Sequence, residues 1–150
     1  MRTHRLEREQ FLPHPVNEVF AFFAQARNLE QLTPSWLSFH VLTPEPIEMG
    51  VGTLIDYRLR VHGLPLRWRS RIQEWEPDRA FIDQQVKGPY RLWHHRHTFE
   101  ARGSGTVVRD TVDYALPFGL LGDGAHPLFV ERDLRRIFAF RHTAVEHLLA

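Results

Sequence analysis

The chain has 150 residues, a formal net charge of +1, no cysteine and 12% aromatic residues. This composition fits one globular domain over residues 1–150, and it excludes a disordered segment, a disulfide scaffold and a thiolate metal site. The near-neutral charge also argues against a nucleic-acid partner. The charged N-terminus lacks the apolar core of a signal peptide, and no apolar run is long enough to span a bilayer, so we expect a cytoplasmic protein without a transmembrane segment.

The first part of the chain predicts one strand and two short helices. Residues 3–12 are expected to be extended, and a helix with Pro15 at its first position follows. Its apolar residues recur at helical spacing, namely Val16, Val19, Phe20 and Phe23. A second helix is expected over 28–32, because Pro34 disfavours its continuation.

The middle of the chain alternates strand-like segments with turn signals. The segments are 37–43, 53–61, 66–75, 80–86, 91–101 and 106–116. Glycine and proline separate them, for example at 62–65 and 103–105. This pattern predicts a meander of antiparallel hairpins.

The last part of the chain predicts a loop and a long helix. Residues 116–124 are rich in glycine and hydrophobic, which suits a flap over an apolar surface. The helix is expected from Pro127 to about Leu149. Its apolar stripe comprises Val130, Leu134, Ile137, Phe138, Val145 and Leu148, with Arg141 on the same stripe. A curved antiparallel sheet of about seven strands wrapped around such a helix is an α+β helix-grip fold.

At this point the chain resembles the SRPBCC superfamily, also called START-like or Bet v 1-like, and within it the bacterial polyketide cyclase/dehydrase and lipid-transport group. The resemblance spans the whole chain and is carried by Val19–Phe23, Asn28–Glu30, Leu32–Pro34, Phe81–Gln85, Gly88–Tyr90, Trp93, His95, His97, Phe99, Glu100, Leu116–Gly119 and Ile137–Arg141. It implies a deep cavity between sheet and C-terminal helix that takes a small hydrophobic or amphipathic molecule. Members include carriers, receptors and a few enzymes, so the resemblance leaves the chemistry open.

Opposed residues of an antiparallel hairpin share one face of the sheet, so the turn at 103–105 predicts which side chains meet. The expected pairs are Phe99 with Val108, His97 with Asp110, His95 with Val112 and Trp93 with Tyr114. These residues are expected to face inward. His94 falls on the opposite, solvent-facing side.

Applied to the turn at 62–65, the same pairing rule predicts a second inner row. The expected inner pairs are Leu59 with Trp68, Tyr57 with Ser70 and Ile55 with Ile72, while Arg58 and Arg60 meet Arg69 and Arg67 outside. Four like charges need an acidic neighbour such as Asp56. The next strand is expected to turn Phe81, Asp83 and Gln85 inward and to leave Trp75, Ile82 and Val86 as an outer apolar patch, which would fit a homodimer contact.

The inward residues define a candidate ligand-binding site. It comprises Tyr57, Trp68, Phe81, Asp83, Trp93, His95, His97, Phe99, Asp110, Tyr114, Phe118 and Arg141. Arg141 needs a carboxylate partner there, either Asp110 or Asp83, because an unpaired buried guanidinium is costly. The entrance is expected at Leu29, Leu32 and Trp36, together with the loop at 118–121.

A His-x-His pair on one strand face supplies two imidazoles that a metal ion could use. The aromatic flanks and the lack of a further inward histidine favour hydrogen-bonded imidazoles instead. We therefore expect no metal and no other cofactor.

Three functions fit these residues. The first is binding or transport of a small hydrophobic or amphipathic molecule, and we favour it. The second is a cyclase or dehydratase in which His97 is the general base, Asp110 orients it, and Arg141 or Tyr114 stabilises an enolate. The third is an interaction module whose core is filled by aromatic side chains.

Overall fold

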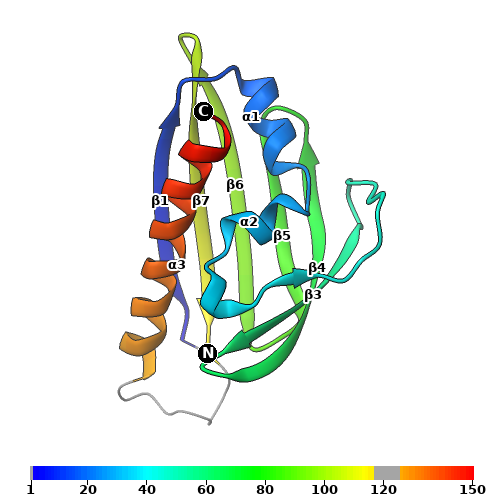
Figure 1. The fold of residues 1–150 in the computed structure, drawn as a ribbon, viewed down its shortest axis with the longest axis vertical. Helices are drawn as coiled ribbons and strands as arrows, with labels where there is room; N and C mark the ends of the chain where they lie inside the picture. The colour runs from blue at the N-terminus through cyan, green and yellow to red at the C-terminus, as the bar shows by residue number, and fades with distance from the viewer. Residues whose placement is uncertain (1, 117–125) are drawn as a thin grey trace.

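The computed structural model describes residues 2–116 and 126–150. Its elements are β1 (His4–Leu12), α1 (Val16–Phe23), α2 (Asn28–Leu32), the 3-10 helix η1 (Ser35–Leu37), β2 (His40–Val41), β3 (Leu54–Val61), β4 (Leu64–Glu76), β5 (Ala80–Lys87), β6 (Leu92–Arg102), β7 (Gly105–Ala115) and α3 (His126–Leu148). The strands form one antiparallel sheet in the order β1-β7-β6-β5-β4-β3-β2 (Figure 1). This architecture confirms the predicted helix-grip fold.

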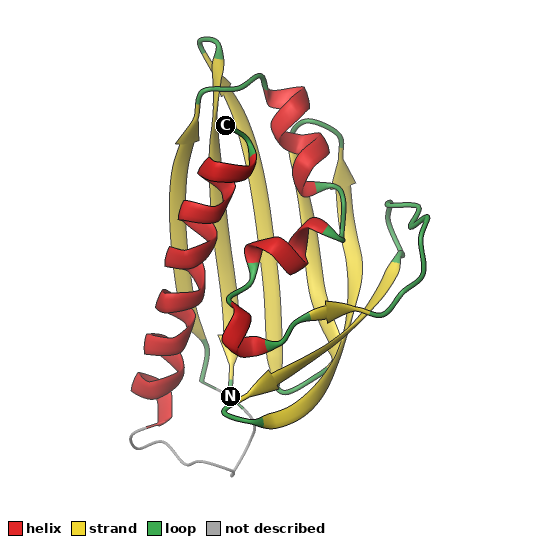
Figure 2. Ribbon diagram, viewed as in Figure 1, coloured by secondary structure: helices red, strands yellow, loops and turns green. Residues whose placement is uncertain are grey.

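The helices α1, α2 and α3 lie on one face of the curved sheet (Figure 2). The expected strand at 37–43 is shorter than predicted, because η1 takes up its start and only His40–Val41 pairs with β3. No helix in the described part of the chain is long and apolar enough to cross a bilayer. Most of the expected flap at 116–124, with Phe118, lies outside the described residues.

The register of β6 and β7 confirms the predicted inner face. Trp93 pairs with Tyr114, His95 with Val112, His97 with Asp110 and Phe99 with Val108. His95 and His97 are 4% and 3% exposed, whereas their neighbour His94 pairs with Asp113 on the outer face. The tight turn at Gly103, whose φ is +59°, sets this register.

The predicted register of β3 and β4 is wrong by two residues. Tyr57 pairs with Trp68 and Ile55 with Ser70, because the turn is a tight one at His62 and Gly63, both with positive φ, and β4 already starts at Leu64. A shift by two keeps every side chain on its face, so the inner row is unchanged. On the outer face Arg69 lies opposite Asp56 and bonds to it at 2.7 Å, as the charge argument required.

The predicted sidedness of Trp75 is also wrong. An irregularity in the β4–β5 pairing between Ile72 and Glu74 places Trp75 opposite Phe81, on the inner face. Trp75 then packs against the ring of Phe20. The outer apolar patch therefore loses its largest member, and the homodimer contact stays a prediction.

Aromatic residues close one end of the space between sheet and helices. The cluster contains Leu12, Val19, Phe20, Phe23, Leu32, Phe81, Phe99, Val108 and Val145, all at most 8% exposed. In this cluster the apolar residues of α1 pack against inward-facing side chains of β5 and β6. We call this cluster the sealed end.

Candidate functional site

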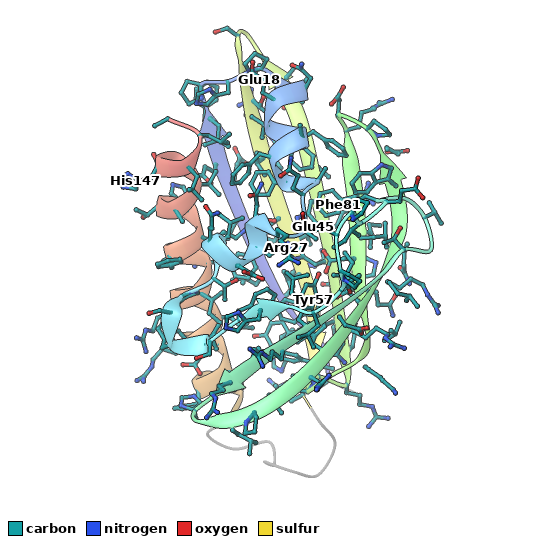
Figure 3. The ribbon with its side chains drawn as sticks, turned by 45° about the vertical axis from the view of Figure 1, so that its right-hand side comes forward. Glu18, Arg27, Glu45, Tyr57, Phe81 and His147 are labelled. Atoms are coloured by element: carbon teal, nitrogen blue, oxygen red, sulfur yellow. The ribbon has the colours of Figure 1, made fainter. Side chains whose placement is uncertain are left out.

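A cavity of about 630 Å³ lies between the inner face of the sheet and the helices. This volume falls within the range of small-molecule sites, about 300–1,000 Å³. Its wall includes Tyr57 of β3 and Phe81 of β5 (Figure 3). Leu29, Leu32 and Trp36, which the sequence placed at the entrance, also line it.

Most of the predicted site residues meet in this cavity. Its lining contains Tyr57, Trp68, Phe81, Asp83, Trp93, His95, His97 and Arg141. Of the other described candidates, Phe99 belongs to the sealed end, Tyr114 packs with Trp93, and Asp110 lies behind the histidines without lining the cavity. A second tyrosine in the wall, the half-buried Tyr90, was missed because it precedes β6 rather than lying in a strand.

Two histidines and two aspartates form a crossed hydrogen-bond arrangement. His97 Nε2 lies 2.6 Å from Asp83 Oδ2, and His95 Nε2 lies 2.8 Å from Asp110 Oδ1. The cross-strand pair His97 and Asp110 is therefore not the short contact that the sequence suggested. His97 Nδ1 lies 3.3 Å from Asp110 Oδ1, without the alignment of a hydrogen bond.

The imidazoles stack on one another, and this separates their proton affinities. Their ring centroids are 3.7 Å apart, with Phe81 stacked on the other side of His97 at 4.0 Å. Burial, and then the like charge of His97, lowers the pKa of His95 to about 4. Burial also opposes a charge on His97, but Asp110 and Asp83 outweigh it and raise the pKa of His97. The first proton taken up by the pair therefore goes to His97 rather than to His95.

The aspartates remain ionised although they are buried. Burial raises the pKa of Asp110, but the positive charge of Arg141 and the hydrogen bond from His95 hold that pKa well below its usual value. Burial acts on Asp83 in the same direction, and the hydrogen bond from His97 brings the pKa of Asp83 below normal. When His97 carries a proton, the positive charges of His97 and Arg141 balance the two carboxylates.

Two buried donors in this cluster have no hydrogen-bond acceptor. They are His97 Nδ1 and Arg141 Nη2, and no other buried side-chain nitrogen or oxygen in the described ranges is left in this state. Arg141 Nη2 is 3.8 Å from Asp110 Oδ1, an ion pair rather than a hydrogen bond. A buried donor without an acceptor is costly, so the cluster is suited to receive an oxygen atom from a ligand or from water.

The geometry of these residues does not fit a tetrahedral metal site. Ligand atoms of Asp83, His95 and His97 lie within 4.8 Å of one another. However, Asp83 Oδ2 and His97 Nε2 are 2.6 Å apart, whereas two ligands of a tetrahedral zinc ion lie about 3.3 Å apart at normal bond lengths. The short separation fits a shared proton, and the nearby guanidinium of Arg141 repels a cation.

The cavity mouth contains two residues that the sequence did not suggest. His62 Nε2 lies 2.8 Å from Asp133 Oδ2, so the β3–β4 turn is bonded to α3. Both residues line the cavity. The sequence offers only a weak indication of this pair, because Asp133 lies beside the apolar stripe of α3 rather than on it. The structure shows that Asp133 is only 9% exposed.

Solved structures with this fold cover nearly the whole chain. Protein TTHA0849 from Thermus thermophilus is 17% identical with a TM-score of 0.75, covering 98% of this chain and 100% of its own. The ZhuI aromatase/cyclase from Streptomyces sp. R1128 is 18% identical with a TM-score of 0.73, covering 97% and 93%. The major latex-like protein 151 from Panax ginseng is 12% identical with a TM-score of 0.67, covering 97% and 96%. At these identities the likeness shows the fold alone.

Among curated proteins no sequence matches the chain. The family described as polyketide cyclase/dehydrase and lipid transport matches residues 12–140. That range includes all strands except β1, and it contains the whole histidine and aspartate cluster together with nearly all of the cavity wall. The chain is therefore a member of the polyketide cyclase/dehydrase and lipid transport family.

Proposed function

We propose that the protein binds a small, largely apolar molecule in the cavity, with one polar group directed to His97 and Arg141. The observation that carries this proposal is the pair of buried donors without a hydrogen-bond acceptor in a mostly apolar wall. An oxygen of the ligand would accept from these donors and remove the cost of leaving them unpaired. Trp68 and Trp93, which meet edge to face at 5.2 Å, would contact the apolar part.

The balance of charge in the cluster narrows the polar group. Asp83 and Asp110 already neutralise His97 and Arg141, so a ligand carboxylate would enter as an uncompensated charge. A neutral carbonyl or hydroxyl oxygen accepts hydrogen bonds without that penalty. The ligand class is therefore an apolar ketone, aldehyde or alcohol.

Displacement of a fluorescent apolar dye tests this proposal. Decanol and decan-2-one are expected to displace N-phenyl-1-naphthylamine, a neutral apolar dye, at lower concentration than decanoate. Leu29→Trp, which narrows the cavity, is expected to weaken dye binding, whereas Leu54→Trp is the matched control because Leu54 is 41% exposed and does not line the cavity. Equal binding in both variants, or stronger binding of decanoate, would contradict the proposal.

A second candidate function is a dehydration or cyclisation reaction, and the opposite pKa shifts of two stacked histidines favour it. Neutral His95 would take a proton from the carbon beside a carbonyl, and protonated His97 would give a proton to the leaving hydroxyl, which departs as water. These roles differ from the sequence-based expectation, because the structure favours His97 as the proton donor.

Catalysis and simple binding are separated by one variant. His97→Gln keeps a hydrogen-bond donor but cannot deliver a proton, so turnover of a β-hydroxy ketone would be lost while dye displacement persists. His94→Gln, on the outer face of the same strand, is the control. Absence of turnover by the unchanged protein would leave binding as the function.

A further inference from the structure

Three apolar side chains that line the cavity are also exposed to solvent, and they mark its mouth. Trp36 of η1, Leu64 at the start of β4 and Phe129 of α3 are 40%, 62% and 41% exposed, and each also lines the cavity. We call them the apolar rim. Large side chains left exposed beside an apolar cavity indicate a contact surface rather than core.

The apolar rim is one continuous surface rather than three separate positions. The ring of Phe129 lies 4.7 Å from the ring of His62, which brings α3 next to the β3–β4 turn and Leu64. The guanidinium of Arg136 lies 5.2 Å from the ring centre of Trp36, which brings η1 next to the same helix. The β3–β4 hairpin and η1 are therefore both neighbours of α3.

Two arginines contact the apolar rim, and two more lie on the outer face of the adjoining hairpin. Arg132 lies over Phe129 at 5.8 Å and Arg136 over Trp36, while Arg60 and Arg67 are exposed on the hairpin just behind its turn. Within residues 2–116 and 126–150, none of these four makes an ion pair with a carboxylate. Their charges are therefore not neutralised by a neighbouring carboxylate of the described residues.

We propose that the apolar rim and its four arginines dock on an anionic phospholipid surface, with the cavity mouth facing the membrane. Arginine attracts the anionic headgroups, and the side chains of Trp, Phe and Leu insert at the boundary between headgroups and hydrocarbon. Arg132 and Arg136 lie against the rings of Phe129 and Trp36, so charge and apolar surface are adjacent there, as in membrane-interface segments. An acidic protein would satisfy the charge but gains nothing from an apolar rim that continues into a cavity.

Flotation with vesicles tests this docking surface. Vesicles of phosphatidylcholine and phosphatidylglycerol in equal amounts are compared with phosphatidylcholine alone. We expect binding to the mixed vesicles that decreases with salt, and a loss of about fivefold for each arginine replaced. The variants are Arg132→Gln with Arg136→Gln, and Arg60→Gln with Arg67→Gln.

A matched control removes the same charge from the opposite end of the sheet. Arg79→Gln with Arg102→Gln changes the β4–β5 and β6–β7 turns and is expected to leave vesicle binding unchanged. Leu64→Gln keeps every charge and is expected to weaken binding about tenfold. These substitutions are at exposed positions, so circular dichroism should show an unchanged fold.

The outcomes separate membrane docking from its alternatives. Equal losses in mouth and control variants would mean unspecific charge attraction and would overturn the proposal. No binding to mixed vesicles at low salt would also overturn it and would leave an acidic protein as the partner that the arginines fit. Dye displacement is measured without vesicles, so ligand binding and docking can fail independently.

Discussion

The two ends of the cavity use the same residue types for different purposes. At the sealed end the ring of Phe20 meets Trp75, Phe81 and Phe99 at 5.2, 6.0 and 5.1 Å, and it is 5% exposed. At the mouth, Trp36 is 40% exposed and its ring faces a guanidinium. Aromatic surface stabilises the fold in proportion to the area removed from water. Phe20 therefore contributes more than Trp36, and the mouth keeps apolar surface for a ligand or a partner.

The largest expected difference between the ends is in stability. Phe20→Ala is expected to lower the free energy of unfolding by about 3–5 kcal/mol, because it removes a buried ring and leaves a cavity. Trp36→Ala is the comparison at the mouth and is expected to cost less than about 1 kcal/mol. Urea denaturation monitored by circular dichroism measures both, and similar costs would show that the mouth is part of the core.

The polar cluster between the two ends is expected to be nearly as sensitive. Arg141→Met keeps the apolar stem against Phe23 and Phe138 but leaves Asp110 without its counter-charge. We expect a loss of about 3 kcal/mol, the lower range for breaking a buried pair. Asp110→Asn in the same protein should recover part of that loss.

Arg135→Met is the control on the same helix, because Arg135 pairs with Glu131 at the surface and is 63% exposed. Its cost should stay below about 0.5 kcal/mol. A cost for Arg135→Met as large as that for Arg141→Met would mean that the pair with Asp110 does not stabilise the fold.

The cluster also predicts a pH dependence that neither end should show. The folded-state pKa of His95 is lowered to about 4, whereas an unfolded chain binds that proton near its usual value. As pH falls below about 7, the unfolded state binds this proton before the folded state does. The free energy of unfolding therefore decreases by about 2 kcal/mol between about pH 7 and pH 5. His97 has a raised pKa, so its contribution is complete below its unfolded pKa and is lost only as pH rises through its folded pKa.

Replacing His95 isolates this effect. His95→Phe should flatten the loss of stability on the acid side, measured by urea denaturation at each pH. His94→Phe on the outer face should keep the wild-type profile. An acid-side loss that persists in His95→Phe would place its origin elsewhere.

The smallest expected effect on stability is at the mouth itself. His62→Ala breaks the contact with Asp133, but His62 is 53% exposed, so we expect a loss below about 1 kcal/mol. Ligand exchange should become faster, because the β3–β4 turn is no longer bonded to α3. Stopped-flow dye binding measures this rate, and an unchanged rate would show that the contact does not control access.

The sequence was sufficient to predict which residues of β6 and β7 form the inner face, because two signals in it agreed. A short glycine turn set the register, and strict alternation separated His95 and His97 from His94. For β3 and β4 the turn could be placed two ways, and alternation does not distinguish registers that differ by two. The inward position of Trp75 results from a local irregularity in the pairing of β4 with β5. Such an irregularity leaves no periodic pattern in the sequence, so it could not be predicted.

The amino-acid sequence by itself determined the order of elements, the sidedness of the histidine strand and the presence of a carboxylate partner for Arg141, since all three follow from periodicity and from the cost of burying a lone charge. Only the tertiary structure decided which aspartate bonds to which histidine, because Asp83 and Asp110 reach the cluster from strands on either side of β6. The protonation of the cluster follows from that arrangement, since burial and the nearest charges act through distances that the order of residues does not contain.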